Sequence, residues 1–170
     1  MNQQENVAAT LACEFAGEIL RTYEEVRLRV FGTSMVPSIL PGDLISVRRV
    51  RLSEISSGEI VLYAREGRLF AHRVVGCAGS SEQPLLITRG DRLSQNDPPV
   101  SPNELIGRVT SIQRDGIEHG DQEIKLSAQA SGPNQALVRL LQASDHATYV
   151  YVRLAAFWQT LFPRRAKCRA

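Results

Sequence analysis

The chain has 170 residues, which is long enough for one compact domain with a hydrophobic core and a helical appendage or two. Hydrophobic residues make up 43% of it, so wholesale disorder is excluded, and a net charge of only +2 argues against nucleic acid as a partner. Three cysteines without a C-x-x-C spacing favour neither a disulfide framework nor a zinc site, so we expect reduced thiols, no metal and no cofactor.

The sequence shows neither a signal peptide nor a membrane span. Its first residues lack a basic start followed by a long apolar stretch, and the apolar segment 154–162 is far shorter than the roughly 20 residues that cross a bilayer. We therefore expect a cytoplasmic protein, with peripheral attachment to a membrane left open.

The first predicted element is an amphipathic helix over residues 6–29, where apolar side chains recur every three or four positions. Short apolar runs separated by Gly, Pro, Asp and Ser then predict strands at 28–31, 44–47, 60–64, 69–75, 85–89 and 106–112. Strands without intervening helices predict a mainly β, antiparallel core. We divide the chain into an N-terminal helix (1–27), the β core (28–113), an irregular link (114–133) and a C-terminal helical region with a basic tail (134–170).

The C-terminal region predicts one or two amphipathic helices over 134–162, broken around 143–147. Aromatic side chains gather there, at Tyr149, Tyr151, Phe157, Trp158 and Phe162. This cluster either docks on the strand core or dips into a membrane interface, so contact with a membrane or a membrane partner is one expectation for this region. The basic tail at 164–169 is either solvated or in contact with an acidic surface.

The segment 31–43 is the most informative in the chain. Gly32 and Thr33 precede Ser34, and the Gly42-Asp43 turn leads into an alternating, strand-like run. A glycine in a tight bend before a strand lets a hydroxyl project from a rigid support, with main-chain N–H groups free beside it. This setting is typical of a nucleophilic serine, which also needs a base to take its proton.

His72 is the candidate base. It lies in a predicted strand 38 residues after Ser34, a separation that suits two strands of one small barrel. The contexts of His119 and His146 suggest nothing catalytic. The turn-rich loop after the strand 85–89 supplies Asp91 and Asp97, either of which can orient the base, while Asp is also a common turn residue.

Together these segments resemble signal peptidase I and the wider clan that includes the LexA-like self-cleaving repressors. The resemblance covers about half of the chain, and the order and spacing of five short motifs carry it: Gly32–Pro37, Gly42-Asp43, Gly58–Val61, His72–Gly76 and Thr88–Asp91. Most bacterial signal peptidases and the LexA-like repressors have lysine as the base. The archaeal and endoplasmic-reticulum type has histidine, as at His72.

The likeness to that Ser-His type implies the remaining site residues. It favours Asp97 as the triad acid, because that type carries an Asp six residues after the Gly-Asp aspartate, and leaves Asp91 to hold the loop, paired with Arg73. Family members often have a hydroxyl residue where Gly32 stands, so here the oxyanion would rest on main-chain N–H groups near Ser34 and on the Thr33 hydroxyl. Met35 is expected to line a shallow pocket for small side chains.

The sequence thus predicts a serine endopeptidase that cleaves a leader, signal or precursor peptide. The alternative is a regulatory member of the clan that cleaves itself or only binds a partner protein, with Cys77-Ala78-Gly79 as a faint match to a self-cleavage site. A histidine base implies activity that rises as an imidazole loses its proton, whereas a profile rising only in strong alkali would point to Lys125.

Overall fold

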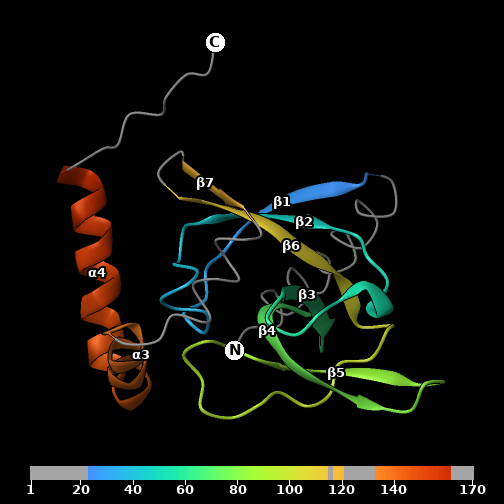
Figure 1. Cartoon of the computed structure of the whole chain (residues 1–170). Helices are drawn as coiled ribbons and strands as arrows, with labels where there is room; N and C mark the ends of the chain where they lie inside the picture. Colours follow the sequence, from blue (N-terminus) through green and yellow to red (C-terminus); the bar gives the residue numbers. More distant parts are fainter. Residues whose placement is uncertain (1–22, 115–116, 121–132, 162–170) are drawn as a thin grey trace.

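A computed structural model describes residues 23–114, 117–120 and 133–161. Within these residues seven strands form one antiparallel sheet in the order β1-β2-β6-β3-β4-β5, and β7 pairs with β6 along the edge opposite β2 (Figure 1). The prediction of a mainly β, antiparallel core is therefore confirmed. The strands are β1 (Glu25–Arg29), β2 (Leu44–Arg48), β3 (Ile60–Arg65), β4 (Arg68–Gly79), β5 (Pro84–Arg89), β6 (Leu105–Arg114) and β7 (Ile117–Gly120).

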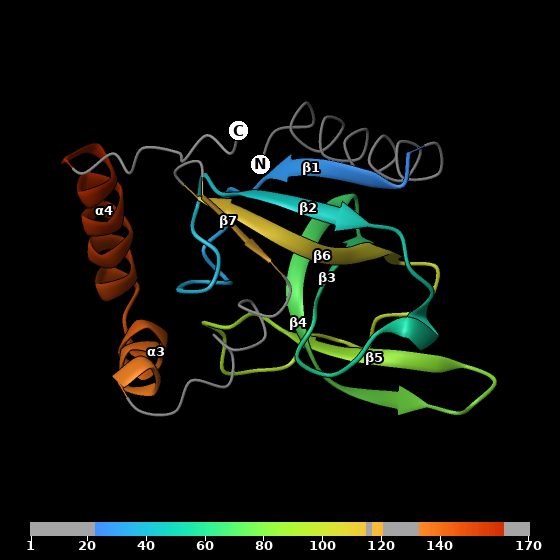
Figure 2. The same ribbon diagram turned by 45° about the horizontal axis from the view of Figure 1, so that its top comes forward.

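The sheet is bent rather than flat. Figure 2 shows β1, β2 and β6 in one layer, with the β4–β5 hairpin turned away from them. The register shifts at Ser46/Val47, at Leu62/Tyr63 and between Val74 and Gly76. Such irregularities increase the local twist and bend a strand, so they let one sheet wrap around its own core.

Two apolar clusters fill the bent sheet. Their fully buried members come mostly from alternate positions of the strands, because successive side chains of a strand point to opposite faces. The first contains Met35, Ile39, Ile45, Val47, Ile60, Leu62, Val109 and Ile112. The second contains Ile55, Val61, Tyr63, Val74, Leu86 and Val100. The central strand β3 contributes alternately to both clusters, which explains why its first four residues are all buried.

Two predictions about the edges of the core need correction. The predicted helix 6–29 cannot reach residue 29, because Glu25–Arg29 is strand β1 and pairs with β2. Val26 and Leu28 alternate there with charged residues. This period-two pattern, typical of a strand, overlaps the helical spacing and decides the structure of the segment. Residues 6–22 lie outside the described residues. The link predicted to be irregular contains β7, which completes a hairpin with β6.

The C-terminal region forms two helices, as predicted, and the break falls at Ser144. Helix α3 spans Pro133–Ala143 and α4 spans Asp145–Leu161, with the Ala147 N–H donating to the Ser144 hydroxyl at the start of α4. Figure 1 shows both helices at one side of the sheet. Of the helices that the structure describes, none combines the length and the apolar character needed to cross a bilayer.

A third apolar cluster joins these helices to the loop between β1 and β2. Leu141 of α3 is buried against Val36 and Leu40 of that loop. Partly buried residues from both helices surround this contact: Leu137, Ala147, Tyr151, Val152 and Ala155. The C-terminal helices therefore pack directly on the segment that carries Ser34.

Gly107 allows β6 to pass close to the end of β2. A Cβ atom at this position would lie 2.5 Å from the main-chain oxygen of Arg48 and 2.9 Å from Cγ1 of Val47. We expect Gly107→Ala to lower the free energy of unfolding by about 1–3 kcal/mol, because backbone atoms must move to admit the methyl group. Urea denaturation measures this change.

Gly76→Ala is the matched control in another strand, since a Cβ there meets no atom within 4 Å. Equal effects of the two substitutions would contradict a steric role for Gly107.

Candidate active site

The loop at residues 30–43, which we call the serine loop, is closed at its base by main-chain hydrogen bonds. The Val30 N–H donates to the Asp43 carbonyl over 2.9 Å, and the Gly42 N–H donates to the Val30 carbonyl over 2.7 Å. Inside the loop the Val36 N–H donates to the Thr33 carbonyl, and Val36 is fully buried. Ser34 therefore lies on a short turn, and the two residues that follow it, Met35 and Val36, are buried in the core.

Ser34, His72 and Asp97 form a continuous chain of hydrogen bonds. Oγ of Ser34 lies 2.9 Å from Nε2 of His72, and Nδ1 of His72 lies 2.6 Å from Oδ2 of Asp97. His72 sits in β4, opposite Val61 of β3, so its main chain is fixed in the middle of the sheet. The structure thus brings together the three side chains that the sequence analysis selected as nucleophile, base and acid.

Asp97 is held by groups to which the sequence analysis gave no role. The Thr88 hydroxyl donates to Oδ2 of Asp97 over 2.8 Å, and the Asp97 N–H donates to the Thr88 carbonyl over 2.8 Å. Thr88 itself is fully buried in β5. The hydroxyl and the main-chain carbonyl of Thr88 together hold the Asp97 carboxylate against the His72 imidazole.

Tyr63 completes the wall behind the imidazole. Its ring stacks on Phe70 and meets the edge of His72, with centroids 5.4 Å and 6.1 Å apart. The pKa of Tyr63 is raised to about 12, chiefly by burial; the hydrogen bond with Thr88 lowers this pKa, and the nearby Asp97 carboxylate raises it. The phenol therefore keeps its proton across the working pH range and stays a hydrogen-bond donor beside Asp97.

Asp91 lies in a different contact network from Asp97. Nε and Nη2 of Arg73 donate to its two oxygens over 2.8 and 2.7 Å, and the Ser38 hydroxyl also donates to it. Arg73 in turn donates through Nη1 to the Gly58 carbonyl over 2.8 Å. Asp91 thus pairs with Arg73 and holds the serine loop through Ser38, while Asp97 is the aspartate that meets His72.

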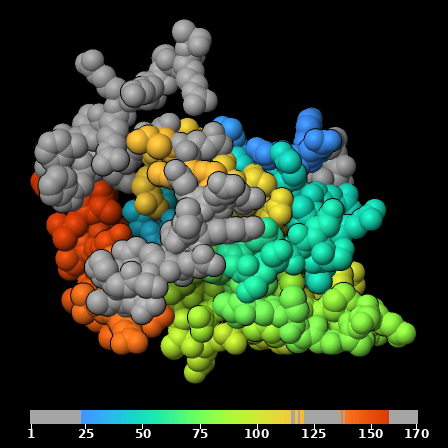
Figure 3. Space-filling model, in the orientation of Figure 1, coloured from blue at the N-terminus to red at the C-terminus, as the bar shows by residue number. Residues whose placement is uncertain are grey.

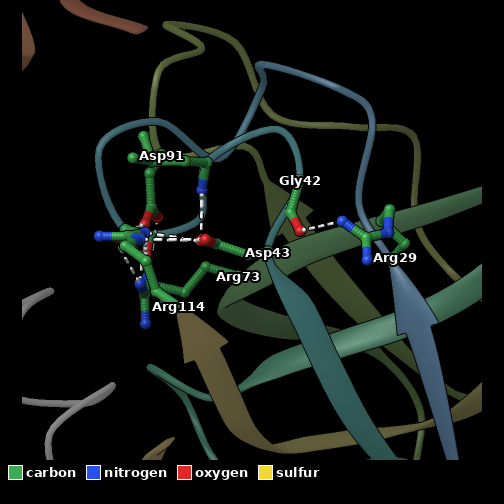
Figure 4. Close-up of polar contacts among 8 residues, drawn as sticks. Arg29, Gly42, Asp43, Arg73, Asp91 and Arg114 are labelled. Atoms are coloured by element: carbon green, nitrogen blue, oxygen red, sulfur yellow. Dashed lines mark hydrogen bonds and ion pairs between the residues drawn. The ribbon is translucent and has the colours of Figure 1, made fainter. Parts of the chain in front are cut away.

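A second arginine fixes the other end of the serine loop (Figure 4). Nη2 of Arg114 donates to Oδ2 of the buried Asp43 over 2.6 Å and to the Ser38 carbonyl over 3.1 Å. The same Asp43 oxygen accepts the Leu40 N–H over 2.7 Å. Nη1 of Arg29 donates to the Gly42 carbonyl over 3.1 Å. No sequence pattern pointed to Arg114, because its contact with Asp43 joins residues 71 positions apart.

Gly90 permits the Asp91 loop to touch Ser34. A Cβ atom on Gly90 would lie 2.8 Å from the Ser34 carbonyl oxygen and 3.0 Å from its Cβ. The same carbonyl accepts the Arg92 N–H over 2.9 Å. Ser34 is thus held on its main-chain side by residues 90–92, which leaves its hydroxyl directed at His72.

The residues predicted to form the oxyanion site and the substrate pocket lie around the Ser34 turn. Gly32 is exposed and has open space around it, and Thr33 is partly buried. The side chain of Met35 is only 2% exposed and belongs to the first apolar cluster. Met35 thus lies in the core directly after Ser34, and its part in a substrate pocket stays a prediction.

The other titratable candidates lie elsewhere. His119 is in β7, and His146 is exposed on α4. Lys125, the alternative base, lies outside the described residues. Within the ranges that the structure describes, no three His, Cys, Asp or Glu side chains are grouped so that they could hold a metal ion.

An antiparallel β core that carries a serine, a histidine and an aspartate in hydrogen-bonded order is typical of the serine-peptidase class of sites. A family model described as Peptidase S24-like matches residues 3–109, well over half of the chain. The chain therefore belongs to the Peptidase S24-like family, within the clan of LexA-like proteins and signal peptidases. No curated protein matches it significantly.

Thr88 offers a test of how the carboxylate is held. We expect Thr88→Val to slow the labelling of Ser34 by a fluorophosphonate about tenfold, because Asp97 loses a hydrogen bond and orients His72 less well. Intact-mass measurement of the labelling rate checks this. Thr110→Val is the control, since the Thr110 hydroxyl donates to the Ser46 carbonyl instead. Equal rates in wild type and Thr88→Val would contradict the expectation.

Arg65 anchors the segment that follows Asp97. Its Nη1 and Nη2 atoms donate to the carbonyls of Pro98 and Pro99 over 3.0 and 2.8 Å, and its Nε donates to Glu104 over 2.6 Å. The hydrogen bond from Arg65 is the main reason that the pKa of Glu104 falls to about 2, and donors from Ser101 lower it further. The arginine thus joins the end of β3 to the loop that carries Asp97.

The low pKa of Glu104 predicts an acid-sensitive contribution to stability. A depressed carboxyl pKa stabilises the folded state above the ordinary value of 4.5, and this contribution is lost as the pH falls from 4.5 towards 2. We expect Glu104→Gln to lower the free energy of unfolding at pH 7 by about 1–3 kcal/mol and to flatten its decline over that range. Denaturation at a series of pH values measures both effects. The exposed Glu66→Gln should leave the curve unchanged, and a Glu104→Gln curve parallel to wild type would refute the assignment.

Proposed function

We propose that this protein is a serine endopeptidase of the Ser-His type, which cleaves a leader, signal or precursor peptide. The single observation that carries the proposal is the chain of hydrogen bonds from Oγ of Ser34 through His72 to Asp97. Its two donor–acceptor distances are 2.9 and 2.6 Å. Membership of the Peptidase S24-like family supports a peptidase in broad terms. The histidine in place of a lysine base supports the likeness to the archaeal and endoplasmic-reticulum signal peptidases.

The geometry suits a two-step acyl transfer. Oγ of Ser34 attacks the scissile carbonyl while Nε2 of His72 accepts its proton, and a covalent bond forms between the serine oxygen and the acyl carbon. His72 then gives this proton to the leaving amine as the C–N bond breaks. Water then attacks the acyl carbon while Nε2 of His72 accepts its proton. The acid product leaves as His72 returns the proton to the oxygen of Ser34.

Asp97 supports the change of charge on the imidazole. Its Oδ2 atom accepts from Nδ1 of His72, which keeps Nε2 as the proton acceptor towards Ser34. When His72 becomes cationic, the adjacent carboxylate stabilises it. Arg73 already neutralises Asp91, so Asp91 adds little to the field at the imidazole.

Main-chain donors are the proposed support for the oxyanion. Neither the Ser34 N–H nor the Met35 N–H donates a hydrogen bond to any residue that the structure describes. Both groups can therefore donate to a developing oxyanion. Gly32 supplies no side-chain donor, unlike the hydroxyl residue that many relatives have there.

Self-cleavage at residues 77–79 is the weaker alternative. The Ala78-Gly79 bond lies within β4, where Ala78 pairs with Leu85 and Gly79 with Pro84 of β5. A scissile bond must reach the serine in an extended segment that is free to move, and a paired strand does not provide one. This observation favours a substrate supplied from another chain.

The test is cleavage of a peptide library, read as new N-termini by mass spectrometry, together with fluorophosphonate labelling read by intact mass. We expect wild type to cleave and to take one label, and Ser34→Ala and His72→Ala to do neither. Asp97→Asn should reduce the rate by about 10³-fold or more, because the imidazole loses its orienting charge.

Ser80→Ala serves as the matched control, since Ser80 is exposed in the β4–β5 turn region. Circular dichroism must show that each variant is folded. Cleavage at the wild-type rate by folded Ser34→Ala would end the proposal, and mass-detected cleavage of the wild-type chain within residues 77–79 would favour self-cleavage instead.

A further inference from the structure

The junction between α3 and α4 contacts both loops that form the candidate active site. On one side, Leu141 is buried against two residues of the serine loop. On the other, Nη1 of Arg92 donates to Oδ1 of Asp145 over 2.7 Å. We call residues 90–97, which follow β5 and end at the aspartate that meets the imidazole, the acid loop. In Figure 3 the two helices, orange and red, form one edge of the molecule. They thus connect the loop of the nucleophile with the loop of the acid.

Arg92 connects this junction to Ser34 itself. Its main-chain N–H donates to the Ser34 carbonyl over 2.9 Å. Its guanidinium reaches α4, where Nη1 also lies 3.5 Å from the hydroxyl of the buried Thr148. Thr148 in turn donates to the Leu141 carbonyl, near the end of α3, over 3.1 Å. One residue therefore holds the main chain of the nucleophile at one end and contacts the helical junction at the other.

Stability alone does not explain the placement of the Arg92 side chain. Its Nε atom is buried and has no hydrogen-bond partner among the residues that the structure describes. A buried donor without a partner costs free energy and calls for another explanation. The ion pair compensates little, because the Asp145 side chain is 93% exposed and solvent screens the attraction. The side chain does, however, span the distance from the acid loop to α4.

The Ser34 carbonyl belongs to the same peptide plane as the Met35 N–H. In a planar trans peptide, the C=O group and the N–H group of the next residue point in opposite directions. The hydrogen bond from Arg92 that fixes the Ser34 carbonyl therefore also fixes the direction of the Met35 N–H. This N–H is one of the two donors proposed above for the oxyanion, and such a donor is effective only when it is held in place before the reaction.

We propose that Arg92 is a positioning residue: its side chain, anchored on α4, holds the peptide between Ser34 and Met35 and so orients an oxyanion donor. The catalytic consequence rests on the proposed peptidase function, whereas the anchoring of the peptide does not. The C-terminal helices then belong to the active site, although they supply none of its three catalytic side chains. Release of the Arg92 side chain from α4 lowers the rate of acyl transfer while the hydrogen bonds among serine, histidine and aspartate remain.

The first measurement is amide hydrogen exchange of the full chain by NMR, which requires no activity. We expect Arg92→Gln and Asp145→Ala each to lower the protection factor of the residue-92 amide about three- to fivefold, because this amide leaves the Ser34 carbonyl more often once the side chain is released. Arg92→Lys, which keeps the charge, should stay close to wild type. The Val74 amide, which donates to the Glu59 carbonyl, should be equally protected in every variant.

The second measurement is kcat and KM of the same variants on a peptide that the wild type cleaves. Arg92→Gln and Asp145→Ala should each lower kcat about three- to fivefold with KM nearly unchanged, because an oxyanion donor acts in the transition state. The double variant should be no slower than either single variant, since both substitutions break the same contact. Arg92→Lys should keep most of the wild-type kcat.

Two matched variants that remove nearby exposed side chains serve as controls. Arg89→Gln changes the exposed arginine at the end of β5, and His146→Ala changes the exposed neighbour of Asp145 on α4. Both should match the wild type in the exchange of the residue-92 amide and in kcat. Thermal unfolding shows whether each variant is folded.

Wild-type protection of the residue-92 amide in Arg92→Gln would overturn the anchoring of the peptide. Lower protection with an unchanged kcat would overturn the positioning role, and so would an additive loss of kcat in the double variant. A raised KM with unchanged kcat would assign Arg92 to substrate binding instead. If the wild type neither cleaves nor takes a label, the proposed function fails, and the exchange rates still decide whether Arg92 holds the peptide.

Discussion

The position of Ser34 depends on two arginine–carboxylate pairs that meet at Ser38. Arg114 binds Asp43 and the Ser38 carbonyl, while Arg73 binds Asp91, which accepts the Ser38 hydroxyl. Buried ion pairs contribute little net stability, because desolvation of the charges cancels most of their attraction. Their directional hydrogen bonds, however, define one geometry for the loop. The structure thus uses charge at this place mainly to fix position.

The two pairs also separate the aspartates of the site electrically. Asp91 faces a permanent guanidinium, so its charge is balanced whether or not a reaction takes place. Asp97 faces an imidazole and the neutral donors Thr88 and Tyr63, which leave its negative charge available to a cation that forms only transiently. If a guanidinium were paired with Asp97, as Arg73 is with Asp91, a permanent cation would lie beside the His72 imidazole and would oppose its protonation. The local partners, rather than the residue type, therefore decide which aspartate can assist His72.

Sequence patterns were informative where the decisive contacts are local. Glycine and proline around Ser34, and alternation around His72, predicted a serine on a loop and a histidine in a strand, and most strand positions followed from the same patterns. The choice between Asp91 and Asp97 came only from family likeness, because both stand in turn-rich sequence.

The failures have the opposite cause. Thr88 and Arg114 act through contacts across 9 and 71 positions that no short pattern encodes. The burial of Met35 in the first apolar cluster likewise depends on strands distant in the sequence. At residues 25–29 two periodicities overlap, and pairing with β2 decides in favour of the strand.

The third apolar cluster has a consequence for where this domain ends. The family match stops at residue 109, yet the loop that carries Ser34 is covered by residues from α3 and α4 and bound by Arg114. A chain cut at the end of the match would uncover Val36 and Leu40 and would lose the cation that compensates the buried Asp43. The cooperative unit that must fold together is therefore larger than the unit of sequence likeness. In hydrogen exchange, amides of the serine loop and of the C-terminal helices should open as one group.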